Sequence, residues 1–406
     1  MMSLQRFNLI SLHEATELLG ISRSTFDRWR KLKQLPFVKI GKEILIDKTE
    51  LEKWVRYHSF GIQQPAFAMG STSMMMPQRP SVITVGYQSG TAHMWTALIM
   101  RELGWFEEEL AKAGSGRTIQ VRWIDAANGP VLLQGLIGGS IQIASLGDYP
   151  ILLSYSLSQT LPAFRPILLA LDGKTSGGQG ISLVVRKGLE IHRASEISSM
   201  KISTVAQSSA SCRLLKLLHS LGGHKSQIEH KEMDESMAGI VQRHISGSAM
   251  WEPYLSLVQY HGAGQVLYQE GLGEDYLTGI VADENWASNN QADTLAYLKA
   301  HLRVHTFMRR DPGSAAKLIA RSKGIPAEVA ARIIAKVRWD AALYAKDLRS
   351  LYLLKSEDDR NVSGVGAAYN EISYKGEYLN QAIEELQLPK LNGGVLKGDW
   401  DQEQIY

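Results

Sequence analysis

The sequence predicts a large α/β body preceded by a small, separate domain of short helices and a hairpin. Three times, a β-type apolar run is followed by a polar loop and then by apolar residues at helical spacing. Segment 59–80 carries three prolines, a run of three methionines and almost no charge, which is typical of an extended linker. Residues 1–60 hold 11 Lys+Arg against 7 Asp+Glu, whereas the remaining chain holds 33 against 34, so the basic excess lies in the head.

Composition excludes several classes of protein. The 406 residues, 44% hydrophobic and 21% charged, match a packed globular protein of two or three domains. A single cysteine, Cys212, excludes an intrachain disulfide and a cysteine-based zinc site. The longest uncharged stretch is interrupted by polar residues and glycines, and the first 25 residues lack the apolar core of a secretory signal. We therefore expect no membrane insertion, no cofactor and a cytoplasmic location.

The head shows the start signals of two helices. Ser11 and Glu14 form a capping box ahead of an apolar stretch that ends at Gly20. Ser22 can cap a second helix, which carries several arginines and leaves Phe26 to pack inward. Only three residues separate the two predicted helices.

The second half of the head predicts a β-hairpin and a closing helix. Two short apolar runs, 37–40 and 44–46, flank a Gly-Lys turn. Asp47 and Glu50 repeat the capping box before Leu51 and Trp54. Helix, tight turn, basic helix and hairpin together form an arrangement that lays the second helix in the DNA major groove while the hairpin contacts phosphate.

The stretch ISLHEATELLGISRSTFDRWRKLKQLPFVKIGKEILIDKTELEKWV closely resembles the excisionase-type winged helix-turn-helix. At the start of the second helix, where base edges are reached, lie Arg23, Ser24, Thr25 and Arg28. The rest of the basic set expected to contact DNA, with the lysines facing phosphates, is Arg30, Lys31, Lys39 and Lys42. A basic amphipathic head could instead dock on a protein.

The body predicts parallel sheets covered by helices, with a ligand crevice where loops leave the strand ends. The polar loops stand directly before helices, so free backbone N–H groups and hydroxyls would point into one crevice, which suits a small anionic or strongly polar solute. The crevice residues predicted from these loops are Gln88, Ser89, Gly90, Thr91, Asn128, Gly129, Gly147, Asp148, Ser208, Ser209 and Ser211. Taken singly, Ser208 or Ser209 is better explained as a helix cap.

Four fragments, at 97–110, 129–150, 183–218 and 247–254, occur in the order found in ABC-transporter substrate-binding proteins of the sulfonate, nitrate and taurine type, which the body resembles. This resemblance implies the two-lobed type II periplasmic-binding fold, with Trp251 and Glu252 at the cleft wall. Trp251 could instead be core packing, and Glu252 would repel an anion if ionised and unpaired. The implied domains are 1–58, linker 59–80, and a ligand domain 81–395, with lobe I at about 81–172 and 279–395 and lobe II at about 173–278.

The predicted function is a ligand-responsive regulator that binds double-stranded DNA and a small solute, with a homodimer left open. The alternative is the solute-binding component of an ABC transporter with an atypical N-terminal domain. The sequence shows no catalytic nucleophile together with a general base, so we expect no enzyme activity. His93 is expected to be a capping or surface histidine rather than a metal ligand, since no second ligand stands at suitable spacing, and Cys212 a small buried residue.

Overall fold

A computed structural model describes residues 9–19, 23, 26, 37–40, 43–51, 81–114, 119–222, 227–354, 372–391 and 393–406. Segment 59–80 lies outside the described residues. So do six of the predicted DNA contacts, Ser24, Thr25, Arg28, Arg30, Lys31 and Lys42.

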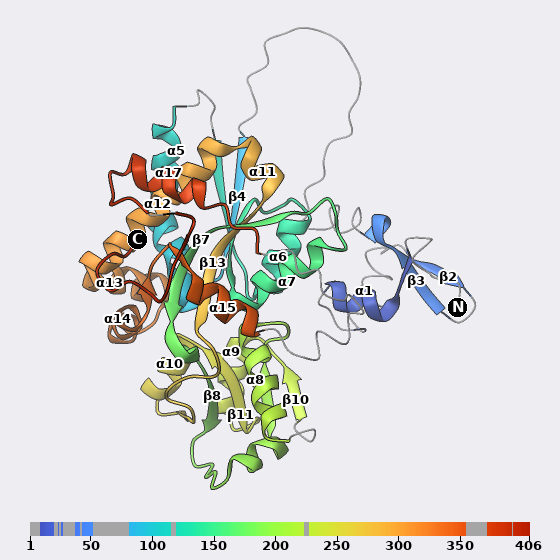
Figure 1. The fold of residues 1–406 in the computed structure, drawn as a ribbon. Helices are drawn as coiled ribbons and strands as arrows, with labels where there is room; N and C mark the ends of the chain where they lie inside the picture. The colour runs from blue at the N-terminus through green and yellow to red at the C-terminus, as the bar shows by residue number, and fades with distance from the viewer. Residues whose placement is uncertain are drawn as a thin grey trace.

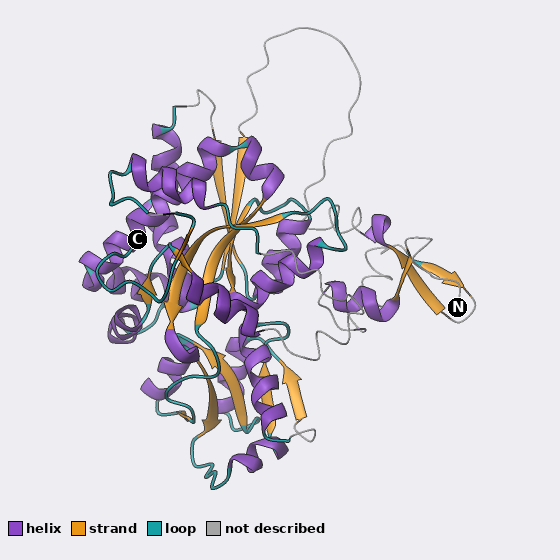
Figure 2. Ribbon diagram, viewed as in Figure 1, coloured by secondary structure: helices purple, strands orange, loops and turns teal. Residues whose placement is uncertain are grey.

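The head forms a three-stranded antiparallel sheet with a helix beside it (Figures 1 and 2). Its described elements are β1 (Leu9–Ser11), α1 (Leu12–Leu19), β2 (Val38–Ile40) and β3 (Glu43–Asp47), with strand order β1-β3-β2. The predicted hairpin is confirmed as β2 and β3, whereas β1 was not foreseen from its three residues. Ile10 of β1 lies opposite Ile46, and both join buried Ala15, Phe26 and Leu51 in a small core, which explains why this short strand is retained.

Both predicted capping boxes in the head can be checked at their N-caps. Ser11 N donates to Glu14 Oε2 at 2.6 Å and Glu14 N donates to Ser11 Oγ at 3.2 Å, so the first box is confirmed. The bond from the Ser11 backbone holds the pKa of Glu14 below its usual value. Asp47 Oδ1 accepts from the backbone N–H groups of Thr49 and Glu50 at the start of the next helical turn.

The body contains two sheets, one in each lobe (Figure 2). The lobe I sheet has the order β14-β7-β13-β6-β4-β5, with β4 (Ser81–Tyr87), β5 (Ile119–Asp125), β6 (Ile143–Gly147), β7 (Pro166–Thr175), β13 (Tyr276–Asp283) and β14 (Arg338–Trp339). The lobe II sheet has the order β10-β9-β11-β8-β12, with β8 (Ile181–Arg186), β9 (Lys201–Thr204), β10 (Gln227–His230), β11 (Gly247–Trp251) and β12 (Gly264–Val266).

The prediction of parallel sheets is wrong in part, because both sheets are mixed. β4 pairs in parallel with β5 and β6, but β13 runs antiparallel to β6 and β7. The reason is the lobe crossing: the chain leaves lobe I at the end of β7 and returns as β13, and Tyr276 pairs with Thr175. A strand that starts where its neighbour ends must run in the opposite direction.

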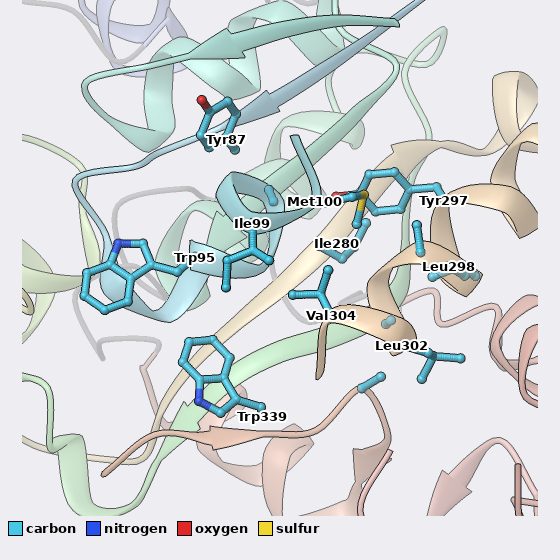
Figure 3. Packing of buried hydrophobic residues seen from close by; sticks show 14 of the residues in the cluster. Tyr87, Trp95, Ile99, Met100, Ile280, Tyr297, Leu298, Leu302, Val304 and Trp339 are labelled. Atoms are coloured by element: carbon cyan, nitrogen blue, oxygen red, sulfur yellow. The ribbon is translucent and has the colours of Figure 1, made fainter. Parts of the chain in front are cut away.

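Helices cover both faces of the lobe I sheet (Figure 1). One face packs on η2 (Ala92–Met94), α4 (Trp95–Leu103), α5 (Trp105–Lys112), α12 (Gln291–Arg310), α13 (Pro312–Lys323), α14 (Ala327–Lys336) and α17 (Gly376–Glu385). The other packs on α6 (Gly129–Ile137), α7 (Asp148–Ser158) and α15 (Ala345–Leu354). Figure 3 shows the first of these cores, in which Trp95, Ile280 and Trp339 are fully buried or nearly so.

The remaining elements complete lobe II and the C-terminal part. In lobe II the helices are η3 (Ser176–Gly178), η4 (Ala194–Ser199), α8 (Ser209–Ser220), α9 (Met233–Val241) and α10 (Tyr254–Tyr260). The others are α11 (Glu284–Asn289) and a short parallel pair of β15 (Leu343–Tyr344) and β16 (Val395–Leu396). Within the described residues, no helix combines the length and apolar character needed to cross a membrane.

Candidate functional site

The loop after β4 meets the predicted wall segment of lobe II. Trp251 Nε1 donates to the backbone oxygen of Gly90 at 2.9 Å, and Ala92 N donates to the backbone oxygen of Glu252 at 2.8 Å. A side chain on Gly90 would reach the Tyr254 hydroxyl. These two predicted groups, one from each lobe, therefore lie in direct contact where the lobes meet.

Glu252 is engaged by the helix that follows it. Its two carboxylate oxygens accept from Ser256 N at 3.0 Å and from Ser256 Oγ at 2.9 Å, at the start of α10. Burial raises the pKa of Glu252, and the two bonds from Ser256 oppose that rise. The carboxylate of Glu252 thus faces its own helix and is not an unpaired charge aimed at a ligand.

Ser89 connects three elements of lobe I. Its backbone N–H donates to Asp125 Oδ1 at 2.8 Å, its hydroxyl donates to Asp125 Oδ2, and Lys323 Nζ lies 2.6 Å from that hydroxyl. The neighbouring Gln88 points its amide at the sulfur of Met94, 3.4 Å away. Both side chains are therefore held by protein groups.

A second group of predicted residues lies where α7 and α8 begin. A Cβ atom on Gly147 would stand 2.8 Å from Ser209 Oγ, so glycine is required for this close approach of the lobes. Asp148, the first residue of α7, is fully buried and forms an ion pair with Arg213 of α8, with Oδ2 to NH2 at 2.7 Å. One buried salt bridge therefore joins the two lobes.

Arg213 makes further bonds to backbone oxygens near the lobe crossing. Its guanidinium donates to the carbonyls of Ser209, Glu274 and Asp275, and it lies 5.4 Å from the ring centre of Tyr276. Burial opposes its charged form, but the Asp148 carboxylate outweighs that cost and the pKa of Arg213 is raised. The charges of Asp148 and Arg213 therefore offset each other where the lobes meet.

The three predicted serines of α8 divide into two roles. Ser208 and Ser211 form a capping box, in which each side chain accepts from the other's backbone N–H, at 3.1 and 3.0 Å. Ser209 lies one residue inside the helix, and its hydroxyl makes no hydrogen bond among the described residues. The N–H groups of Ser209 and Ala210 have no partner within the helix, as expected for a first turn. Ser209 is therefore the serine whose hydroxyl and backbone N–H remain available to donate hydrogen bonds.

Asn128 performs two tasks at the start of α6. Its Oδ1 accepts from Val131 N at 3.1 Å as the helix cap, and its Nδ2 donates to Glu232 Oε1 of lobe II at 2.7 Å. Burial raises the pKa of Glu232. The adjacent Gly129 leaves no room for a Cβ beside Pro150, so α6 and α7 begin side by side.

His93 joins the two groups of residues, and the expectation of a surface position is wrong. It is fully buried, its Nε2 lies 3.1 Å from Thr175 Oγ1, and its ring contacts that of Tyr276 with 4.6 Å between centroids. Burial and, to a lesser extent, Arg213 lower the pKa of His93 to about 3, so the ring is neutral. Nearby Thr91, also buried, forms no side-chain cap with the short helix that follows it.

The described part of the head contains two of the predicted DNA contacts, Arg23 and Lys39. Arg23 is helical and exposed, while Phe26, three residues later, is fully buried. Lys39 lies in β2, the outer strand of the predicted hairpin.

Several residues that contact the predicted site residues were missed by sequence reasoning. Arg213 stands four residues after Ser209 and hence on the same helical face, a signal that was available. Asp125, Glu232, Tyr276 and Lys323 come from separate elements, and only the fold shows that they lie near the predicted loops. Cys212 is half-buried, with its sulfur 3.4 Å from the backbone oxygen of Leu354.

Comparison with known proteins supports the two-part organisation. A family model described as a helix-turn-helix domain matches residues 9–58. A Bacillus subtilis (strain 168) protein named for the binding of aliphatic sulfonates is 23% identical over 255 residues, which cover 62% of this chain and 73% of that protein.

Solved structures resemble the body. The alkanesulfonate-binding protein SsuA from Xanthomonas axonopodis pv. citri, bound to MOPS, has a TM-score of 0.58 and 16% identity, covering 74% of this chain and 99% of its own. The periplasmic nitrate-binding protein NrtA from Synechocystis PCC 6803 has a TM-score of 0.56 and 12% identity, covering 76% and 90%. The body therefore has the periplasmic-binding-protein fold, preceded by a helix-turn-helix domain, and none of these similar proteins is named as an enzyme.

Proposed function

We propose that this chain is a ligand-responsive DNA-binding regulator, in which the two-lobed body senses a small anionic or polar solute. The observation that carries the proposal is the joining of a helix-turn-helix domain to a solute-binding fold in one chain. Neither part alone requires the other. Joined, they supply the two sites and the two-state element that regulation by a solute needs.

The head supports the DNA-binding half of the proposal through charge and exposure. Arg23 is exposed beside buried Phe26, so it is free to face a partner while the domain keeps its core. The basic excess of the whole chain lies in residues 1–60. Arginine at the start of such a helix is suited to guanine recognition. DNA binding also requires that this protein work in the cytoplasm.

The crevice supports a small, polar ligand. Thr91, Ser209 and the first N–H groups of α8 are the donors that other protein groups leave least engaged, and Gly147 faces Ser209 across the crevice. Because Asp148 and Arg213 neutralise each other, recognition would rest on hydroxyl and backbone donors rather than on a free charge. Sulfonate, nitrate and carboxylate groups match such donors.

A route from the crevice to the head is present at the start of α8. Gln207, the residue before the Ser208 cap, donates through its side chain to the backbone oxygen of Glu17 in α1, at 3.5 Å. Leu18 of α1 packs on the second lobe I core, and Ile137 of α6 packs on the head core. Movement of α8 relative to lobe I would therefore change the surroundings of α1.

The second candidate is the solute-binding component of an ABC transporter. It is favoured by the similar proteins, whose names describe sulfonate and nitrate binding. Two of them are solved structures that share the fold of the body. If the chain is a transporter component, the head would dock on a protein partner. The two candidates therefore differ in whether the full chain selects DNA.

The deciding experiment is selection of DNA fragments from the genome of the source organism by the purified full-length protein at physiological salt, followed by sequencing. We expect one or a few discrete sites, and Arg23→Ala should weaken binding by about 1 to 3 kcal/mol for each base-edge hydrogen-bond pair that it removes. A matched control is Arg243→Ala, on the exposed surface of lobe II. No selected site with the wild-type protein would reject the regulator and favour the transporter component.

A further inference from the structure

We infer that Asp172, His301 and His305 form a buried binding site for one divalent transition-metal ion of the zinc class in the core of lobe I. Asp172 lies in β7, and His301 and His305 stand one turn apart on α12. One ligand atom from each residue lies within 4.8 Å of the others, and all three residues are fully buried. Two histidines and one carboxylate are a donor set that zinc and iron prefer.

The histidine rings are oriented as metal ligands would be. His301 Nε2 lies 2.9 Å from the backbone oxygen of Leu171, and His305 Nδ1 lies 3.0 Å from the backbone oxygen of Tyr406. A carbonyl oxygen only accepts, so each of these two nitrogens carries the proton. His301 Nδ1 and His305 Nε2 are left as lone pairs, and fixing the far nitrogen of a ligating histidine on a carbonyl is the usual outer-shell arrangement.

Two atoms of the cluster lack the partner that a cation would supply. His301 Nδ1 and Asp172 Oδ2 are buried and make no hydrogen bond within the described part of the chain. Leaving such groups unsatisfied costs about 1 to 3 kcal/mol each, so two of them in one buried cluster need an explanation. A metal ion between them satisfies both at once.

The remaining contacts hold the carboxylate in place. Asp172 Oδ1 accepts from Thr96 Oγ1 at 2.5 Å and lies 3.0 Å from His305 Nε2. Tyr297, one turn before His301, is also fully buried, and its hydroxyl adds a further oxygen to this polar region of α12.

The position indicates a structural role. β7 leads the chain into lobe II, and α12 is a long helix that packs on one face of the lobe I sheet. An ion held by both would fasten the helix to the strand, much as an internal cross-link does. The rival arrangement is a metal-free network in which Asp172 Oδ1 and His305 Nε2, 3.0 Å apart, share one proton.

The test uses the full-length protein without an affinity tag, loaded with zinc, passed through a desalting column and analysed for metal by mass spectrometry. We expect about one zinc ion per chain. His301→Gln keeps an amide donor toward Leu171 but removes the free nitrogen, and His305→Asn does the same toward Tyr406. Each should lower metal affinity at least tenfold, while His244→Gln, at an exposed histidine, should not.

Cobalt substitution makes the test independent of variant folding. Wild-type protein loaded with Co²⁺ should show visible bands of a nitrogen and oxygen site, without the thiolate-to-metal absorption that Cys212 would produce. Metal below about a tenth of an equivalent in wild-type protein, a thiolate band, or equal occupancy in folded His301→Gln would each overturn the assignment.

Discussion

Two fully buried ion pairs in the body have different roles, although each joins a basic side chain to an aspartate. Lys174 and Asp347 lie within lobe I, between β7 and α15, with 2.9 Å between Nζ and Oδ2. Arg213 and Asp148 lie between the lobes, joining α8 to α7 at 2.7 Å. Both pairs have almost no exposed side-chain surface.

The pair within lobe I is fully satisfied by its surroundings. Lys174 also donates to the backbone oxygen of Ala342 at 2.5 Å and lies over the ring of Tyr344. Asp347 accepts from Trp400 Nε1 at 2.6 Å and from the Tyr344 backbone at 2.9 Å. Every element that contributes belongs to one lobe, so this pair can only be broken by unfolding.

The pair between the lobes is less complete. Arg213 Nε is buried without a partner in the described residues, and the rest of its guanidinium bonds backbone oxygens at the lobe crossing. Water could replace these contacts if the lobes moved apart. The comparison teaches that a buried ion pair fastens a core when all its partners move together, and acts as a closure contact when they do not.

The largest expected effect comes from breaking the pair within lobe I. Lys174→Met leaves Asp347 buried without its counter-charge and should cost about 3 to 5 kcal/mol of unfolding free energy. Urea denaturation followed by circular dichroism measures it. The control is Lys201→Met, which removes a partly exposed ion pair with Glu229 and should change stability by no more than about 0.5 kcal/mol. Similar costs in both variants would show that burial does not set the strength of the lobe I pair.

Breaking the pair between the lobes should cost less and change shape more. Asp148→Asn leaves Arg213 buried and uncompensated only while the lobes stay closed, so opening relieves part of the strain. We expect a loss of about 1 to 3 kcal/mol together with a larger radius of gyration by small-angle X-ray scattering. A loss as large as that of Lys174→Met with no expansion would contradict the closure role.

The pH dependence of stability provides a further test of the contact between the lobes. His93, beside Arg213, has a pKa of about 3 when folded against 6.5 when exposed. Below pH 6.5 the unfolded chain therefore takes up a proton that the folded chain refuses, and stability falls. Each such histidine contributes about 1.4 kcal/mol per pH unit. His93→Gln should flatten that slope by about this amount between pH 6 and pH 4; an unchanged slope would show that His93 opens to water.

Much of the fold could be predicted because its signals are local. The Ser11 and Glu14 box, the Asn128 cap and the loop glycines each fix a helix start through residues two or three positions apart. The antiparallel return of β13 could not be predicted, because it follows from where the chain leaves lobe I. The sequence pattern also gave no reason to pair Asp172 with His301 and His305, more than a hundred residues later.

In the candidate site, too, local features could be predicted from the sequence and tertiary contacts could not. Sequence position showed that Ser208, Ser209 and Ser211 stand at a helix start, but only the structure shows that Ser208 and Ser211 are used by each other. The Arg213 partner of Asp148 comes from the other lobe, and tertiary pairing of this kind leaves no local pattern. The predicted ligand set itself stays a prediction.

The smallest effect on stability is expected from the proposed ligand donors. Thr91→Val together with Ser209→Ala should change unfolding free energy by less than about 1 kcal/mol, because neither hydroxyl holds the fold together. The same double variant should lose the rise in melting temperature that we expect MOPS, taurine or nitrate to produce in wild-type protein. Asp311→Ala is the control, since it should lose about 1 kcal/mol through its cap on α13 while keeping the solute effect. A normal solute effect in the double variant would reject the proposed crevice.

The central claim is that the body's closure changes DNA binding, and one titration tests it most directly. The dissociation constant for the genomic fragment with the highest enrichment would be measured by fluorescence anisotropy at fixed ionic strength, with and without the solute that raises the melting temperature. The account predicts a change of roughly 5 to 150-fold, reduced in Asp148→Asn. An unchanged dissociation constant at a solute concentration that saturates the thermal shift would contradict it.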